Sequence, residues 1–210
     1  MRRFMIAFGL LAALAACGAE PVAAPAEEVQ KYRTPGTAPS SITLVTVISN
    51  RDNSGAHSGL FINASERAVF DPAGTFKHPW TPEVNDLHYG LTPRMEEIYI
   101  DYHARETYRV QTQTLTVSPE TAERILVAAK NYGAVPKAYC ANSITSILSG
   151  TPGFDWVPST FFPRTVAAAF AARPGVVTRI YRDDSPDDRT DLQVEMITRA
   201  PQMSVELATR

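Results

Sequence analysis

The stretches HSGLFIN (residues 57–63) and ERAVFDP (residues 66–72) lie two residues apart in this chain. Both are short and rich in apolar and aromatic residues, and the Ala64-Ser65 turn joins them, a pattern that predicts a β-hairpin. The near-continuous apolar run ITLVTVI (residues 42–48) precedes them and is typical of a buried strand. We expect these three strands to form the centre of a sheet.

The register of the hairpin has two alternatives, which place its polar residues differently. A two-residue loop sets Ser58 opposite Asp71 and turns His57 to the other face. A three-residue loop, or a bulge, sets His57 opposite Asp71 with the two side chains within reach. The sequence does not decide between these registers.

The rest of the chain alternates between further strands and helices. Residues 73–94 contain many Pro and Gly residues and are expected to form a long loop. Apolar patterning predicts strands at residues 96–103, 107–117 and 176–182. Helical spacing and Gly stops predict helices at residues 119–131, 140–149 and 164–172, the first with Ser118 as its cap. This order predicts an α+β fold, an antiparallel sheet packed against a few helices.

The composition indicates one globular domain with polar extensions. The 210-residue chain has a formal net charge of −2, and no segment concentrates Lys and Arg, which argues against nucleic-acid binding. Residues 41–183 have the apolar content of a single core. Residues 17–40 are rich in Ala and Pro and are expected to form a stalk, and residues 184–210 a loosely attached polar tail.

The N-terminus is typical of an export signal. Arg2 and Arg3 precede an apolar run at residues 4–16, which is too short to span a bilayer as a helix. The residues LAACG (14–18) resemble the lipobox of bacterial lipoproteins, which implies cleavage of residues 1–16 and a lipid on Cys17. An ordinary signal with an incidental cysteine is the alternative. Because Gly18 is not Asp, the resemblance implies the outer membrane, with the protein facing the periplasm.

Cys140 is the other cysteine of the chain and is unpaired if Cys17 carries lipid. It stands at the expected start of a helix, where free backbone N–H groups favour a thiolate. It also shares the apolar face of Ile144, so it could be a small core residue. An isolated histidine such as His57 is more often a surface or structural residue, although the small residues beside it suit a side chain that faces a cleft.

The motifs AHSGLFI (56–62), VFDPAG (69–74) and YCANSITSIL (139–148) resemble, in this order, the circularly permuted papain-like proteins. These include the permuted branch of the NlpC-type cell-wall peptidases and the lecithin–retinol acyltransferase group. In both, a His-bearing strand precedes a helix that opens with Cys. The resemblance covers about half of the chain, and each motif alone is short.

The resemblance implies that Cys140 is the nucleophile, His57 the general base and acid, and Asp71 the residue that orients the imidazole. The chemistry agrees, because a thiol needs a base in reach and the base needs a third group that fixes its tautomer. The Cys140 backbone N–H could hold the oxyanion. Candidate second donors are Asn50, Asn53 and Tyr139.

Other groups of polar and aromatic residues are weaker candidates for a functional site. His78, His88 and His103 lack metal-ligand spacing, so no metal site is expected, and no motif for a cofactor is found. Four aromatic residues could line a cleft but more often pack in a core: Trp80, Trp156, Phe161 and Phe162. Glu96 and Glu97, read as strand neighbours, would face opposite ways.

The sequence therefore predicts a membrane-anchored thiol hydrolase or acyltransferase that cleaves an amide or ester bond. A lipid-anchored protein can reach the cell wall, which makes peptidoglycan peptides the first substrate class and a lipid or protein-linked acyl group the second. The alternative is a non-catalytic binding or assembly lipoprotein of the envelope with the same fold. That alternative expects Cys140 to be buried away from His57.

Overall fold

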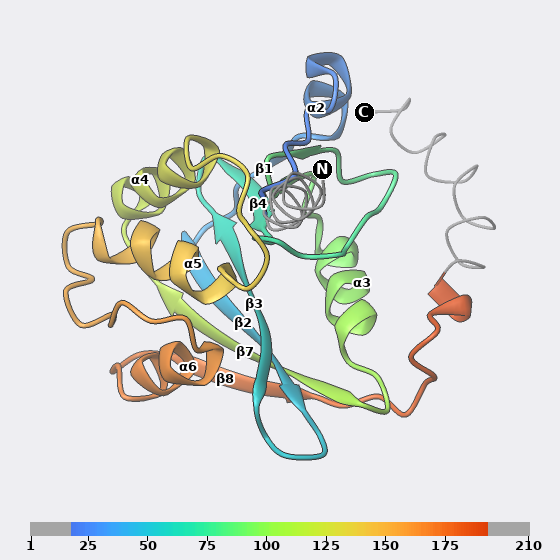
Figure 1. Cartoon of the computed structure of the whole chain (residues 1–210). Helices are drawn as coiled ribbons and strands as arrows, with labels where there is room; N and C mark the ends of the chain where they lie inside the picture. Colours follow the sequence, from blue (N-terminus) through green and yellow to red (C-terminus); the bar gives the residue numbers. More distant parts are fainter. Residues whose placement is uncertain (1–17, 193–210) are drawn as a thin grey trace, which may run out of the picture.

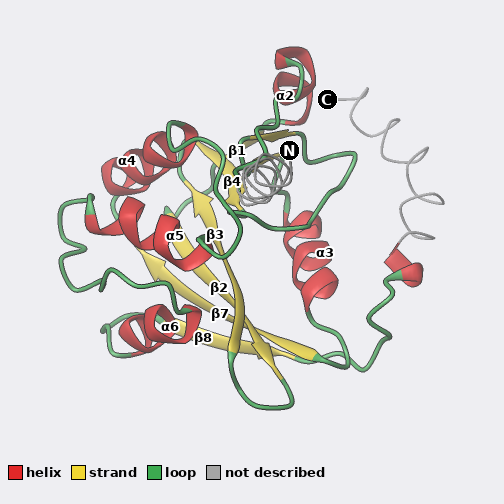
Figure 2. Ribbon diagram, in the orientation of Figure 1, coloured by secondary structure: helices red, strands yellow, loops and turns green. Residues whose placement is uncertain are grey.

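The computed structural model describes residues 18–192 and confirms a mixed α+β architecture (Figures 1 and 2). The expected signal peptide at residues 1–16, the lipid site at Cys17 and residues 193–210 of the expected tail lie outside the described part. No helix within residues 18–192 is long and apolar enough to cross a bilayer.

One antiparallel sheet of eight strands forms the centre, in the order β5-β6-β4-β3-β2-β7-β8, with β1 paired to β4. Its strands are β1 (Thr34–Pro35), β2 (Ser41–Ser49), β3 (Gly55–Asn63), β4 (Glu66–Phe70), β5 (Glu83–Val84), β6 (Leu87–Tyr89), β7 (Tyr108–Thr116) and β8 (Val177–Tyr181). The long apolar run of the sequence is the central strand β2, which is buried on both faces between β3 and β7. A strand covered on both faces needs this continuous apolar pattern.

The helices cover the two faces of the sheet unequally. They are α2 (Ala26–Tyr32), α3 (Pro93–His103), α4 (Pro119–Lys130), α5 (Cys140–Ser149) and α6 (Pro163–Ala171). Helices α4, α5 and α6 pack on one face, where Leu44 and Leu60 belong to the larger core cluster. Helix α3 packs on the other face against Val45 and Phe61. The alternation of side chains along β2 and β3 supplies both cores.

The hairpin of β3 and β4 takes the three-residue connection, because Asn63 pairs with Arg67 and Leu60 with Phe70. The next position of this register sets Gly59, not His57, opposite Asp71, so that detail of the prediction is wrong. His57 and Asp71 nevertheless share a face, and His57 reaches Asp71 diagonally. Since β4 ends at Phe70, the first half of β3 has an open edge (Figure 1).

The predicted strand at residues 96–103 is wrong, because this segment is the helix α3. Thr92 caps the helix, its hydroxyl accepts a hydrogen bond from Met95 N, and Pro93 occupies the first turn. The buried residues Met95, Ile98, Tyr99 and His103 follow a helical spacing. Ile98, Ile100 and Tyr102 alternate with polar residues, which is typical of a strand. The Thr92 cap and Pro93 indicate a helix instead.

Two segments expected to be irregular also form regular structure. The expected loop at residues 73–94 contains β5 and β6. The expected stalk at residues 17–40 is attached to the domain: Ala24 N donates to Glu83 O at 2.9 Å, and β1 pairs with β4. Arg33 of this segment forms an ion pair with the buried Glu66 carboxylate at 2.8 Å, which composition alone does not reveal.

The expected loose tail is docked as far as residue 192. Arg105 is fully buried, and its guanidinium contacts the Asp191 carboxylate at 2.8 Å. The Arg189 guanidinium lies over the Tyr102 ring at 4.2 Å, and Leu192 is buried. Because a buried arginine needs a carboxylate partner, the acidic segment that ends at Asp191 is part of the fold.

Helix α5 depends on core packing for its position. We expect Ile144→Ala to lower the free energy of unfolding by about 2–5 kcal/mol, since Ile144 is completely buried between α5 and the sheet. Val127→Ala on α4, where Val127 is 45% exposed, is the control and should change it by less than about 0.5 kcal/mol. Denaturant titration of both variants measures the difference, and equal effects would contradict this packing.

Candidate active site

Cys140 opens α5 at the point where β4 has left the edge of β3. Its side chain is nearly buried, with 8% of the residue exposed. The His57 side chain and the backbone amides of Ser58 and Ala141 lie close enough to the thiol to lower its pKa. The open edge of β3 therefore supplies both a backbone donor and an imidazole to the sulfur.

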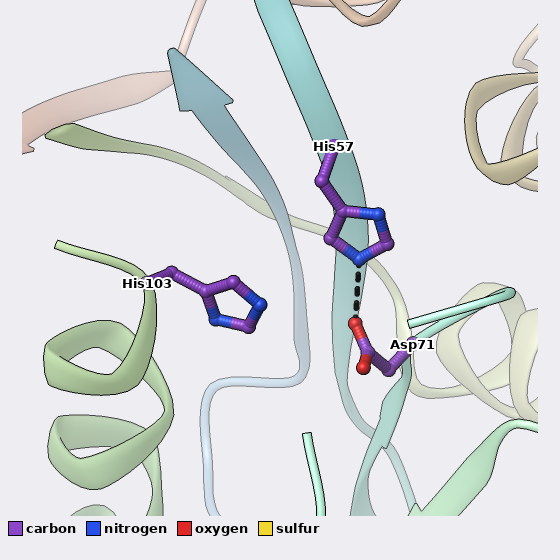
Figure 3. A group of neighbouring side chains, drawn as sticks. All are labelled: His57, Asp71 and His103. Carbon is purple, nitrogen blue, oxygen red and sulfur yellow. Dashed lines mark hydrogen bonds and ion pairs between the residues drawn. The ribbon is translucent and has the colours of Figure 1, made fainter. Parts of the chain in front are cut away.

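His57 lies between Cys140 and Asp71. Its Nε2 is 2.7 Å from Asp71 Oδ1, and its side chain is 14% exposed, whereas the Asp71 side chain is fully buried (Figure 3). Because Nε2 faces the carboxylate, Nδ1 is the ring nitrogen that remains for the thiol. The structure thus brings Cys140, His57 and Asp71 together, with a hydrogen bond between His57 and Asp71.

Asp71 is held in place by a residue that the sequence analysis missed. The hydroxyl of Tyr99, on α3, donates to Asp71 Oδ1, the oxygen that also faces His57. Gly59 makes room for this contact, because a Cβ at this position would collide with the Tyr99 hydroxyl and lie 3.6 Å from Asp71 Oδ1. Tyr99 was missed because its helix was predicted as a strand.

The environment of the thiol favours its ionised form. Burial raises the pKa of Cys140, but the hydrogen bond and charge of His57, with the amides of Ser58 and Ala141, outweigh burial and bring the pKa below its ordinary value. A thiolate is the nucleophilic form of cysteine. The site is therefore organised for a reactive sulfur rather than for an inert core thiol.

The same couplings act on His57 and Asp71. Burial lowers the pKa of His57, and the charge and hydrogen bond of Asp71 raise it by more, so the net shift is upward. Burial raises the pKa of Asp71, and the charge of His57 lowers it well below its usual range. These shifts favour a protonated His57 and an ionised Asp71, and they increase the thiolate fraction of Cys140.

His103 is a second residue that the sequence analysis did not place in the site. Its ring stacks on His57 with a centroid distance of 5.7 Å, and its Nδ1 lies 2.9 Å from Tyr99 O (Figure 3). Burial and the charge of His57 lower the pKa of His103 to about 4, although Asp71 opposes the shift. His103 is therefore neutral at physiological pH, with Nδ1–H donating to the carbonyl.

His57, Asp71 and His103 each offer a possible metal-ligand atom, and these atoms lie within 4.8 Å of one another. The expectation of no metal site rested on the spacing of His78, His88 and His103, which did not include this set. The bonds to His57 and Tyr99 already occupy Asp71 Oδ1, while Oδ2 is buried without a hydrogen-bond partner among residues 18–192. The arrangement of Oδ1 is accounted for without an ion.

The candidate oxyanion donors separate into two groups. The Asn50 amide donates to Glu106 O at 3.0 Å, and Asn53 Oδ1 accepts from Arg109 at 2.6 Å, so both side chains serve the β2–β3 turn. Tyr139 directly precedes Cys140 and is 44% exposed. The Cys140 backbone N–H, at the start of α5, is the donor that the fold places next to the sulfur.

The other histidine, aromatic and glutamate residues considered from the sequence lie outside the candidate active site. His88 is buried in β6, and His78 Nδ1 accepts from Trp80 N at 3.2 Å. Trp80 is buried and Trp156 packs on Phe170, as expected of core residues, whereas Phe161 and Phe162 are exposed. Glu96 and Glu97 lie on α3 and form ion pairs with Arg67 and Arg94.

The chain matches no protein-family model, and comparison with curated proteins and with solved structures finds no significant match.

The pH dependence of thiol alkylation tests the ionisation of Cys140. The lowered pKa of Cys140 predicts that the rate of modification by iodoacetamide falls less between pH 9 and pH 7 than it does for a free cysteine. His57→Ala removes the largest of the interactions that lower this pKa and leaves only the amides of Ser58 and Ala141 against burial, so alkylation at pH 7 should slow by about tenfold. Intact-mass measurement gives the rates, and an unchanged profile in His57→Ala would contradict the contact.

Gly59→Ala tests the fit of Tyr99 against Asp71. The added methyl group collides with the Tyr99 hydroxyl, so we expect a loss of about 1–3 kcal/mol in unfolding free energy and slower alkylation of Cys140. Tyr99→Phe removes the colliding oxygen, so the double variant should lose less than the sum of the two single variants. Strict additivity in a double-mutant cycle would exclude this contact.

Proposed function

We propose that the protein is a thiol hydrolase or acyltransferase that cleaves an amide or ester bond through an acyl-thioester on Cys140. The observation that carries this proposal is the placement of His57, which lies beside the Cys140 thiol and lowers its pKa while its Nε2 is hydrogen-bonded to Asp71. A nucleophile, a base in reach and a third group that orients the base are the parts that this chemistry needs. Tyr99 acts as a positioning residue behind Asp71.

The reaction follows from the resting state of the site. The Cys140 thiolate attacks the carbonyl carbon, and the oxyanion that forms is stabilised by the N–H at the start of α5. His57 gives its proton to the leaving amine or alcohol as the C–N or C–O bond breaks, which leaves a thioester and a neutral imidazole. His57 then takes a proton from water, or from an acceptor alcohol or amine, which attacks the thioester and releases Cys140.

The proposal extends to fold family and location. The chain order of a His-bearing strand, an acidic residue at the end of the next strand and a Cys-initiated helix supports a circularly permuted papain-like fold. The lipobox-like residues 14–18 support a lipoprotein anchored through Cys17, facing the periplasm from the outer membrane. Peptidoglycan peptides are then the first substrate class to test, and lipid or protein-linked acyl groups the second.

A purely structural role for Cys140 requires the thiol to be separated from the imidazole. A binding or assembly module with an inert thiol would have no use for an imidazole that lowers the pKa of the thiol, or for the buried carboxylate behind His57. The contact between Cys140 and His57 therefore favours the enzyme over the non-catalytic envelope lipoprotein.

The test is a search for the acyl-enzyme in the full chain. The protein is incubated with cell-wall peptides and, separately, with phospholipid esters, and intact mass reports an adduct that hydroxylamine removes. Cys140→Ala should abolish adduct and turnover, and Asp71→Asn should slow turnover by about 10²–10⁴-fold. Turnover that survives in Cys140→Ala would overturn the proposal.

A matched control separates chemistry from folding. Ser146→Ala changes an exposed hydroxyl on the same helix, which donates only to the backbone carbonyl of Asn142. This variant should retain full turnover. If neither substrate class reacts and iodoacetamide leaves Cys140 unmodified in the folded protein, the non-catalytic alternative takes its place.

A further inference from the structure

Exposed aromatic side chains lie next to Cys140 in the chain and just before α6. Tyr139, Phe161 and Phe162 are 44%, 49% and 70% exposed, and the Tyr139 and Phe161 rings contact each other with a centroid distance of 4.9 Å. Tyr139 precedes Cys140, and Phe162 precedes α6, which starts at the same end of the helical layer as α5 (Figure 1). Adjacent exposed aromatic residues of this kind mark a contact surface.

Cationic side chains border this aromatic surface. Lys137 lies two residues before Tyr139, and its side chain is 76% exposed, 4.0 Å from the equally exposed Glu20. Arg164 is exposed in the first turn of α6, next to Phe162. Arg164 and Arg182 both lie close enough to Arg109 for their charges to lower its pKa together with burial. No carboxylate within residues 18–192 forms an ion pair with Arg164 or Arg182.

The start of the described chain lies on this side of the domain. Gly18 and Lys137 line one pocket, and Asn85 N donates to Val22 O at 3.0 Å, which fixes the segment within a few residues of Cys17. No long stalk therefore separates a lipid on Cys17 from the domain. An anchor at this point would hold the loop that leads to Cys140 near the bilayer surface.

We propose that the surface formed by Tyr139, Phe161 and Phe162, with Lys137 and Arg164, docks on an anionic lipid bilayer. Aromatic side chains insert at the headgroup level, and neighbouring cations pair with anionic headgroups. This proposal rests on the proposed function. If Cys140 is the nucleophile, its substrates are acyl or peptide groups presented at the membrane surface, rather than groups held away from it.

Site-directed fluorescence tests the docking without any turnover. The full chain carrying Cys140→Ser and Phe162→Cys is labelled with bimane and reconstituted into vesicles of phosphatidylcholine and phosphatidylglycerol that contain nitroxide-labelled lipid. Quenching at position 162 should exceed that of a matched Val127→Cys label on α4 by at least about fivefold. The Cys140→Ser parent measures any label on Cys17.

Two further controls test whether docking depends on charge and whether the same surface contacts a second copy of the chain. Lys137→Glu with Arg164→Glu, or vesicles of phosphatidylcholine alone, should reduce the quenching at position 162 by about half or more. Equal quenching at positions 162 and 127 would overturn the docking surface. Concentration-dependent shielding of position 162 without vesicles would also overturn it, in favour of contact between two copies. Because every arm carries Cys140→Ser, failure here leaves the acyl-enzyme test unaffected.

Discussion

The site depends on the buried contact between the Asp71 carboxylate and His57. A carboxylate with no exposed surface is costly unless a charge and hydrogen bonds compensate it. His57 and the Tyr99 hydroxyl supply that compensation, and the negative charge in turn raises the pKa of the imidazole. The imidazolium then favours the Cys140 thiolate. The buried Asp71 carboxylate thus influences the protonation of both His57 and Cys140.

The fold provides this contact by ending one strand early. While β4 pairs with β3, the edge of β3 is occupied; after Phe70 that edge becomes free, and Asp71 turns toward the α3 face. Helix α5 begins beside the free edge, so its first residue meets the Ser58 amide and the His57 ring. The active residues come from three elements whose positions are fixed by the two hydrophobic clusters.

The sequence predicts the residues of the site better than the elements that support it. Cys140, His57 and Asp71 were named through the resemblance of three motifs in their order, whereas strand alternation left the pairing of His57 with Asp71 open. The central strands and the helices α4, α5 and α6 follow from apolar patterning. Tyr99 and His103 were missed because an alternating apolar pattern was preferred over the Thr92-Pro93 helix start. The docked termini were missed because Arg33 and Arg105 find their carboxylates only through tertiary contacts.

The central claim is that Cys140 and His57 form a thiolate–imidazolium pair backed by Asp71. Nitrogen-15 NMR of the His57 ring at pH 7 tests this claim most directly, because it reports the protonation of both ring nitrogens. The account predicts that Nδ1 and Nε2 both carry protons, and that His103 is a neutral tautomer protonated at Nδ1. A neutral His57 with one unprotonated nitrogen at pH 7 would contradict it.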